Sequence, residues 1–195
     1  LSSIMSLVKD DIPVIVFQNL SIQLLPQWHY AVVIGFDSDK GTVTLHTGLT
    51  PNHEMSLELF ERTWGRGNYW YLAPVPPNVT SPEMTPFTYV SAAYDMLKVG
   101  DKARSLAFLE TASHTWPTYW LSYFLIANYY LEQNDNQAVA WFEKGYEVGQ
   151  HQHVYVHNYV LALRENNMPE KANTILKQGL ERFPNNEPLL TLAEK

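Results

Sequence analysis

The sequence of 195 residues contains no cysteine. The chain therefore has no disulfide bonds and no thiolate metal ligands, and it lacks the nucleophile of cysteine-dependent enzymes. Apolar residues make up 46% of the sequence and charged residues 17%. This composition is typical of a chain that buries a hydrophobic core and not of a disordered one.

Basic residues and long apolar runs are also scarce. The chain has 13 Lys and Arg against 20 Asp and Glu, a net charge of −7. This balance argues against non-specific nucleic-acid binding, which needs a basic surface to neutralise phosphates. No apolar run approaches the roughly 18 residues that cross a bilayer. We therefore expect neither a nucleic-acid partner nor a membrane span, and the composition leaves cytoplasm, periplasm and cell envelope undecided.

The segment 1–75 has the pattern of a small α+β unit. Residues 1–13 contain neither an initiator Met at position 1 nor a signal-peptide pattern. They resemble the end of a helix that leads into a strand, and we therefore expect the chain to be a fragment of a longer protein. The β-rich segments PVIVFQ, WHYAVVIGF, TVTLHTG and NYWYLAPV predict four strands, the second and third paired across the turn DSDKG. SLELFERTW predicts a helix capped by Ser56.

A proline-rich linker is predicted at residues 76–85, and a helical repeat follows from 86 to 195. The stretch from 74 to 86 contains five prolines, which interrupt both strands and helices. Beyond it, FLETA at 108–112 matches WFEKG at 141–145, and WFEKG matches ILKQG at 175–179, so the two intervals are nearly equal. Each block follows a second helical segment, and a small residue (Ser105, Ala138 or Ala172) stands where the two helices would pack.

A helix pair that recurs at an interval of about 34 residues resembles the tetratricopeptide repeat. The resemblance covers residues 86–184, about three repeats, and EPLLTLAEK at the end resembles a capping helix. It implies an all-α superhelix with turns near Gly100, Asn134 and Asn167. We expect Asp101 and Asp135 to be helix N-caps and Pro169 to lie in a first helical turn. It also implies a protein or peptide partner bound on the concave surface.

Seven side chains are predicted to line that concave surface. Large aromatic rings and arginine are the residue types that dominate binding energy at protein interfaces. The aromatic residues also fit a packed helix, so packing and recognition remain alternatives for them. The predicted binding residues are Phe87, Tyr94, Trp120, Tyr123, Tyr130, His157 and Arg164.

The segments DIPVIVFQNL, WHYAVVIGFDSDKGTVTLHTG and SLELFERTW resemble the C-terminal half of a papain-like cysteine peptidase of the bacteriocin-leader (double-glycine) processing type. From the residues alone, a histidine at the head of an apolar strand is most often a core residue that contacts a neighbour. The resemblance instead implies that His29 is the general base, with the orienting acid of the family replaced by Thr47. His46, next to Thr47, is the alternative partner of His29.

The family's nucleophilic cysteine has no counterpart in this chain. We therefore expect the chain to be inactive as a peptidase and to act as a protein- or peptide-binding fragment. The alternative is a non-catalytic scaffold or adaptor with a degenerate peptidase-like domain. Self-association through the incomplete peptidase half stays open.

No cofactor and no metal site are predicted. His153 and His157 stand four residues apart on one helical turn, a spacing that suits a metal ion, but no acidic residue or cysteine joins them at ligand spacing. A solvated helix start is the preferred interpretation of these histidines.

Overall fold

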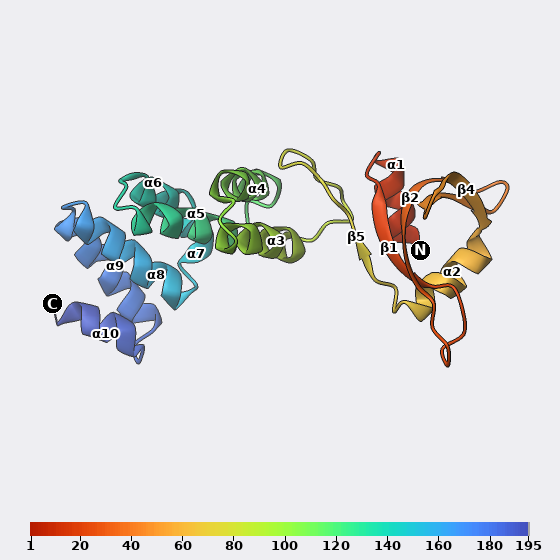
Figure 1. Cartoon of the computed structure of the whole chain (residues 1–195). Coiled ribbons are helices and arrows are strands. Elements are labelled where there is room, and N and C mark those ends of the chain that lie inside the picture. Colours follow the sequence, from red (N-terminus) through yellow and green to blue (C-terminus); the bar gives the residue numbers. More distant parts are fainter. Residues whose placement is uncertain (195) are drawn as a thin grey trace. The chain divides into compact units, whose positions relative to one another are not determined.

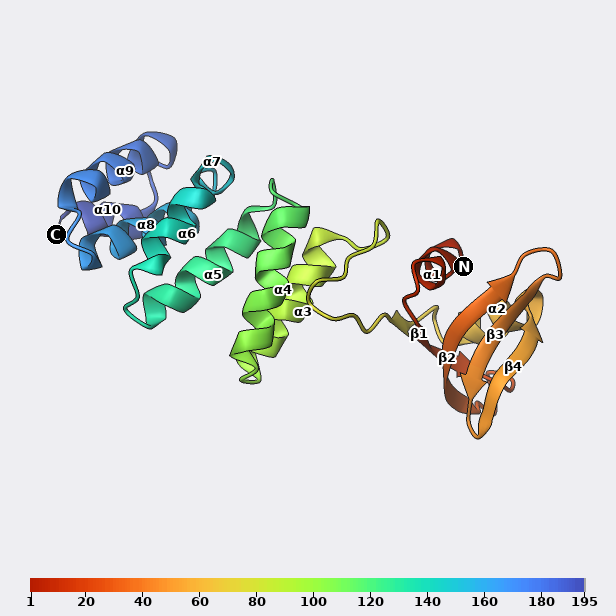
Figure 2. The same ribbon diagram turned by 90° about the horizontal axis from the view of Figure 1, so that it is seen from above.

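The computed structural model describes residues 1–194, which form two compact units, one before and one after the boundary between Met84 and Thr85. Figure 1 labels their elements. The first unit contains α1 (Ser2–Lys9), β1 (Val14–Asn19), β2 (Trp28–Asp37), β3 (Thr42–Thr47), β4 (Thr50–Ser56), α2 (Leu57–Arg66) and β5 (Tyr71–Leu72). The five strands form one antiparallel sheet in the order β4-β3-β2-β1-β5, and Figure 2 shows β2, β3 and β4 side by side.

Alternation along the strands gives this sheet one buried face. Val14 and Val16 of β1, Ala31 and Val33 of β2, and Val43 and Leu45 of β3 are all buried, whereas the residues between them are more exposed. They form one core with Ile4 and Leu7 of α1 and with Phe60 and Trp64 of α2. The period of two that predicts strands therefore also decides which side chains meet the helices.

The sheet differs from the predicted one at two places. The strand β4 was not predicted, because its sequence TPNHEMS is polar and contains a proline; such a strand is compatible only with the edge of a sheet, which is where β4 lies. The predicted last strand at 68–75 is reduced to Tyr71–Leu72. Asn68 and Tyr69 have φ values of 58° and 55°, which turn the chain before the strand begins.

The second unit contains helices and turns and no strand in its described residues, as predicted. Its helices are α3 (Pro86–Lys98), α4 (Lys102–Thr115), α5 (Trp120–Glu132), α6 (Gln137–Lys144), α7 (Tyr146–Gly149), α8 (His153–Glu165), α9 (Pro169–Arg182) and α10 (Glu187–Ala193). The pairs α3–α4, α5–α6 and α8–α9 pack together, and Figures 1 and 2 both show α3 beside α4. The chain therefore contains helical repeats with the predicted spacing.

The turns within the three pairs share one backbone feature. Gly100, Asn134 and Asn167 have φ values of 96°, 53° and 56°, the left-handed conformation that ends a helix. Asp101 caps α4 by accepting a hydrogen bond from the Arg104 amide, and Pro169 begins α9, both as predicted. The prediction of Asp135 as an N-cap is wrong by one residue, because the N-cap of α6 is Asn136; the Asp135 carboxylate nevertheless accepts a hydrogen bond from the Gln137 amide.

The three small residues that were predicted at the contacts between paired helices are buried. Ser105, Ala138 and Ala172 are completely buried. The Ser105 hydroxyl donates a hydrogen bond to the Ala93 carbonyl at 2.7 Å, so this polar side chain is satisfied inside the α3–α4 pair. No helix in the described part of the chain is both long and apolar enough to span a bilayer.

Candidate functional site

His29 and Thr47 meet at one end of the sheet. β2 pairs with β3 so that Ala31 lies opposite Thr47, which places His29 on the same face as Thr47 and one step beyond this pair. His29 Nε2 lies 2.6 Å from Thr47 Oγ1, a hydrogen-bond distance. Both side chains are half-buried, so the His29 ring is neither sealed in the core nor free in solvent.

His46 is not the partner of His29. Its side chain is exposed and lies on the opposite face of β3, and its Nδ1 accepts a hydrogen bond from the Asn52 amide at 3.2 Å. Of the two predicted partners, the structure brings only Thr47 into contact with His29.

The hydrogen bond to Thr47 leaves the second nitrogen of the His29 ring available. Among the described residues, no side chain or backbone group makes a hydrogen bond to His29 Nδ1. If Nε2 donates its proton to the Thr47 hydroxyl, Nδ1 carries a lone pair and can accept a proton. This division of roles between the two ring nitrogens is the one that a general base requires.

A buried amide lies directly across the sheet from His29. Gln18 pairs with His29 in the β1–β2 register, and its Nε2 donates a hydrogen bond to the Thr63 hydroxyl of α2 at 2.7 Å. Gln18 is not among the predicted site residues, although a glutamine at the end of the apolar run PVIVFQ is a signal of a buried polar contact. The contact joins α2 to the strand that borders β2 at the histidine.

Apolar loops surround the His29 end of the sheet. In an antiparallel sheet the β1–β2 and β3–β4 connections lie at the same end, which is the end where β2 begins and β3 stops. Leu24 in the first loop is 86% exposed, and Leu49 in the second is fully exposed. Neither 18–36 nor 41–53 contains a charged residue, so the loops around the histidine are uncharged.

The β1–β2 loop is held in place by side chains at its base. Asn19 Oδ1 accepts hydrogen bonds from the amides of Ser21 and Gln27, at 3.0 and 2.9 Å. Arg66 of α2 donates to the Ser21 carbonyl at 2.8 Å. These contacts fix both ends of the loop while its leucine side chains stay exposed.

The seven predicted binding residues of the repeats do not have equal access to solvent. Phe87 and Tyr94 on α3 are exposed, Phe87 by 68%. Tyr123 is only 5% exposed, and its hydroxyl donates to the Ser113 carbonyl at 3.0 Å, so the structure places this ring inside the α4–α5 packing and not on a binding surface. The half-buried members are Trp120, Tyr130, His157 and Arg164.

Two of the half-buried residues already have polar contacts. His157 Nδ1 lies 2.8 Å from Asn158 Oδ1, and Arg164 donates to the Leu192 carbonyl at 2.8 Å. His153 packs against the Phe183 ring, with 6.0 Å between ring centroids. Within residues 1–194, no group of three His, Asp or Glu side chains is arranged to hold a metal ion.

Burial, more than nearby charge, raises the pKa values of tyrosines in the second unit. It raises the pKa of Tyr89 to about 12 and raises the pKa values of Tyr155 and Tyr159 above the ordinary range. The Glu143 carboxylate raises the pKa of Tyr159 further. These tyrosines are neutral packing groups at neutral pH, because removing their protons would place a charge in an apolar interior.

Neither a protein-family model nor a curated protein sequence matches the chain. Among solved structures, the N-terminal domain of stress-induced protein-1 (STI-1) from C. elegans is similar, with a TM-score of 0.49 and 18% identity over 56% of this chain and 92% of that chain. A crystal structure of MamA protein is similar with a TM-score of 0.45 and 16% identity, over 50% of this chain and 54% of that chain. The description of the second unit as helical repeats rests on its own helix pairs and their spacing.

Proposed function

We propose that this chain is a protein-binding tetratricopeptide-repeat array joined to the base-bearing half of a papain-like cysteine peptidase module. The repeat spacing, the small residues between paired helices and the absence of strands from the described residues after position 85 support the first part. The second part is supported by one observation, the 2.6 Å contact between His29 Nε2 and Thr47 Oγ1.

In this proposal, Thr47 orients His29 and His29 Nδ1 takes the proton of a nucleophile. Thr47 provides a hydrogen bond but no negative charge, so an imidazolium formed on His29 is stabilised less than beside the family's aspartate. The nucleophile is a cysteine thiol in the family, and this chain has no cysteine. The chain alone therefore binds and does not cleave peptides.

In the proposed binding surface of the repeats, Phe87 and Tyr94 of α3 are exposed, and Trp120 and Tyr130 of α5 are half-buried. Aromatic rings provide contact area with few rotatable bonds to immobilise. Tyr123 is no longer part of this surface, because its ring and hydroxyl are used in packing.

The peptidase part is tested on the product of the complete gene, whose intact mass is measured first. A thiol-reactive peptidase probe is expected to label a cysteine outside residues 1–195 in the wild type, and His29→Ala is expected to reduce this labelling at least tenfold. His46→Ala is the matched control, since His46 is exposed and lies on the other face of β3. Equal labelling of His29→Ala and wild type would contradict the role of His29.

The alternative function, a scaffold with a degenerate peptidase-like unit, is favoured by threonine at the position of the orienting aspartate. It predicts no labelling of the complete product at all.

The binding part is tested separately by screening a peptide array with the wild type, Phe87→Ala and Tyr94→Ala. Loss of an interface aromatic typically weakens binding by roughly tenfold or more. Val99→Ala, an exposed apolar residue in the α3–α4 turn, is the control. Equal capture by all four proteins would contradict a binding role for α3.

A further inference from the structure

The interface between α6 and α8 shows how one aromatic ring fills the contact between successive repeats. Tyr159 of α8 is 1% exposed, and its ring centroid lies 5.5 Å from that of Phe142 and 5.6 Å from that of Tyr146. Its hydroxyl lies 3.5 Å from Glu143 Oε1. Tyr159 is therefore in contact with a ring and a carboxylate of α6 and with a ring of α7.

The same positions one repeat later have different side chains. The alignment of WFEKG with ILKQG places Leu176, Lys177 and Leu180 at the positions of Phe142, Glu143 and Tyr146, and it places Ala193 at the position of Tyr159. Contacts at the repeated glycines support this register. A Cβ on Gly145 would meet Tyr155, and a Cβ on Gly179 would meet Leu189, which is the equivalent of Tyr155 in the same alignment.

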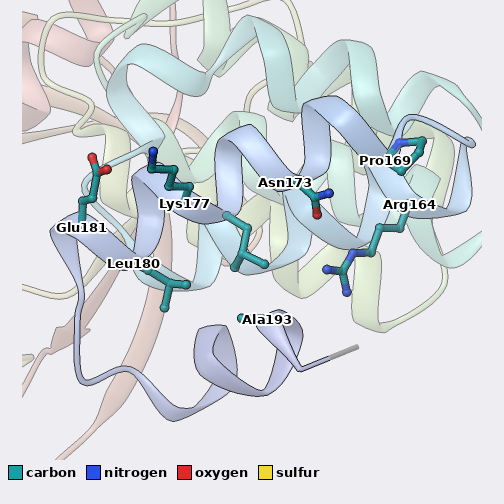
Figure 3. Close-up of a pocket in the computed structure, with 8 residues that line it drawn as sticks. Arg164, Pro169, Asn173, Lys177, Leu180, Glu181 and Ala193 are labelled. Atoms are coloured by element: carbon teal, nitrogen blue, oxygen red, sulfur yellow. The ribbon is translucent and has the colours of Figure 1, made fainter.

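A pocket of about 840 Å³ is found where this interface lacks its ring. Figure 3 shows its walls, which come from α9, from the end of α8 and from α10. Leu176, Leu180 and Ala193 are three of its lining residues, and they are the equivalents of the aromatic cluster around Tyr159. A methyl group at Ala193 leaves open the space that a phenol ring fills one repeat earlier.

The charge beside this space is also reversed. Glu143 lies beside the Tyr159 hydroxyl, and the equivalent residue one repeat later is Lys177, which lines the pocket. Within residues 1–194, Lys177 has no hydrogen bond or ion pair. Arg164 lines the pocket as well, and one of its guanidinium nitrogens donates a hydrogen bond to the Leu192 carbonyl. Glu181 is the one acidic residue among the lining residues. An occupant with a ring and a neighbouring anionic group matches both the apolar walls and the two cations.

We propose that the α9–α10 pocket is a docking site for an aromatic side chain of a partner protein that carries an acidic group beside the ring. The ring takes the place that Tyr159 occupies between α6 and α8, and the acidic group pairs with Lys177. This proposal names the chemistry of a partner and rests on the proposed protein-binding function of the repeats.

The test uses the complete chain with isotope-labelled alanine and leucine methyl groups, observed by NMR. The probes are 4-hydroxyphenylacetate, which has a ring and a carboxylate, p-cresol, which has the ring alone, and acetate. We expect 4-hydroxyphenylacetate to shift the methyl signals of Ala193 and Leu176 at lower concentration than p-cresol, and acetate to leave them unchanged.

Variants separate the ring from the charge. Ala193→Tyr fills the pocket and is expected to abolish binding of both aromatic probes while raising the melting temperature, which shows that the variant is folded. Lys177→Glu restores the charge of Glu143 and is expected to weaken 4-hydroxyphenylacetate at least fivefold without affecting p-cresol. Lys102→Glu, on α4, is the control for the change in net charge.

Three results would overturn the proposal. Absence of any shift at Ala193 would show that the pocket does not accept a ring. Equal affinities of wild type and Lys177→Glu for 4-hydroxyphenylacetate would show that Lys177 does not pair with an acidic group of the occupant. Shifts at Ala193 that depend on protein concentration without any probe would identify a second copy of the chain as the occupant. The Phe87 and Tyr94 variants of the peptide array lie on α3, so their failure would be distinguishable from failure of this pocket.

Discussion

Replacing Gly145 by alanine tests how tightly successive helix pairs pack. An added Cβ would lie 2.5 Å from Tyr123 Cβ and 2.5 Å from the Tyr155 hydroxyl oxygen. Neither neighbour can move without loss, because the Tyr123 hydroxyl donates to the Ser113 carbonyl and the Tyr155 hydroxyl donates to the Phe142 carbonyl at 2.8 Å. The glycine also marks the break between α6 and α7.

The expected cost follows from two opposing effects. Overpacking a filled interior typically costs about 1–3 kcal/mol, and alanine is favoured over glycine in helical backbone by about 1 kcal/mol. The contacts of 2.5 Å lie far below van der Waals distance, so we expect the overpacking cost in the upper part of its range, about 2–3 kcal/mol, and a net loss of about 1–2 kcal/mol in the free energy of unfolding. For a unit of this size, that loss corresponds to a melting temperature lower by roughly 5–12 °C.

The assay is urea and thermal unfolding of the complete chain, followed by far-ultraviolet circular dichroism. Gly35→Ala is the control, because a Cβ there would make only ordinary contacts of 3.6 and 3.7 Å with Thr44. In the Tyr155→Phe background the clash with the hydroxyl oxygen is absent, so the two changes should cost less together than separately. An unchanged or higher stability of Gly145→Ala would refute the close packing of these helices.

Three further changes test the packing of the repeats. Ala138→Leu is expected to cost roughly 1–3 kcal/mol through overpacking of the α5–α6 pair, measured by urea unfolding; no change would mean that this residue is not at the close approach. Ser105→Ala is expected to cost about 1–2 kcal/mol, because the Ala93 carbonyl loses its hydrogen bond inside the α3–α4 pair, and a stability equal to wild type would contradict this. Burial raises the pKa of Tyr89 to about 12 and raises that of Tyr155, so the folded state keeps protons that the unfolded state loses above about pH 10. The stabilisation that these two tyrosines contribute should be complete below about pH 10 and should be lost as the pH rises to about 12. Ionisation of both tyrosines near pH 10 in an ultraviolet titration of the folded protein would contradict this.

The sequence was sufficient to predict the repeats, because their signals are local and repeated. The spacing of FLETA, WFEKG and ILKQG, together with residues such as Gly100 that favour a positive φ, predicted helix pairs and turns that the structure contains. The strands β1, β2 and β3 were predicted in a similar way, from local runs of β-forming residues. The edge strand β4 has no such pattern of apolar residues, because an edge strand buries little of either face.

The candidate sites were predicted less completely. His29 and Thr47 were selected through a resemblance, and their contact depends on the register between β2 and β3, which the sequence does not specify exactly. Tyr123 and Trp120 were both predicted on the same binding surface, yet Tyr123 is 5% exposed and donates its hydroxyl hydrogen to the Ser113 carbonyl, whereas Trp120 is half-buried. The pocket beside Ala193 is visible in the sequence only as an alanine in place of a tyrosine, and its meaning depends on knowing what Tyr159 touches.

The proposed orientation of His29 by Thr47 is the central chemical feature of the first unit, and one measurement tests it directly. In a nitrogen-15 NMR spectrum of the complete chain with labelled histidine, we expect neutral His29 to carry its proton on Nε2, with Nδ1 unprotonated. Thr47→Val should remove this preference, and His46→Ala should leave it intact. A proton on Nδ1 in the wild type, or identical His29 signals in wild type and Thr47→Val, would contradict the assignment of His29 as a base oriented by Thr47.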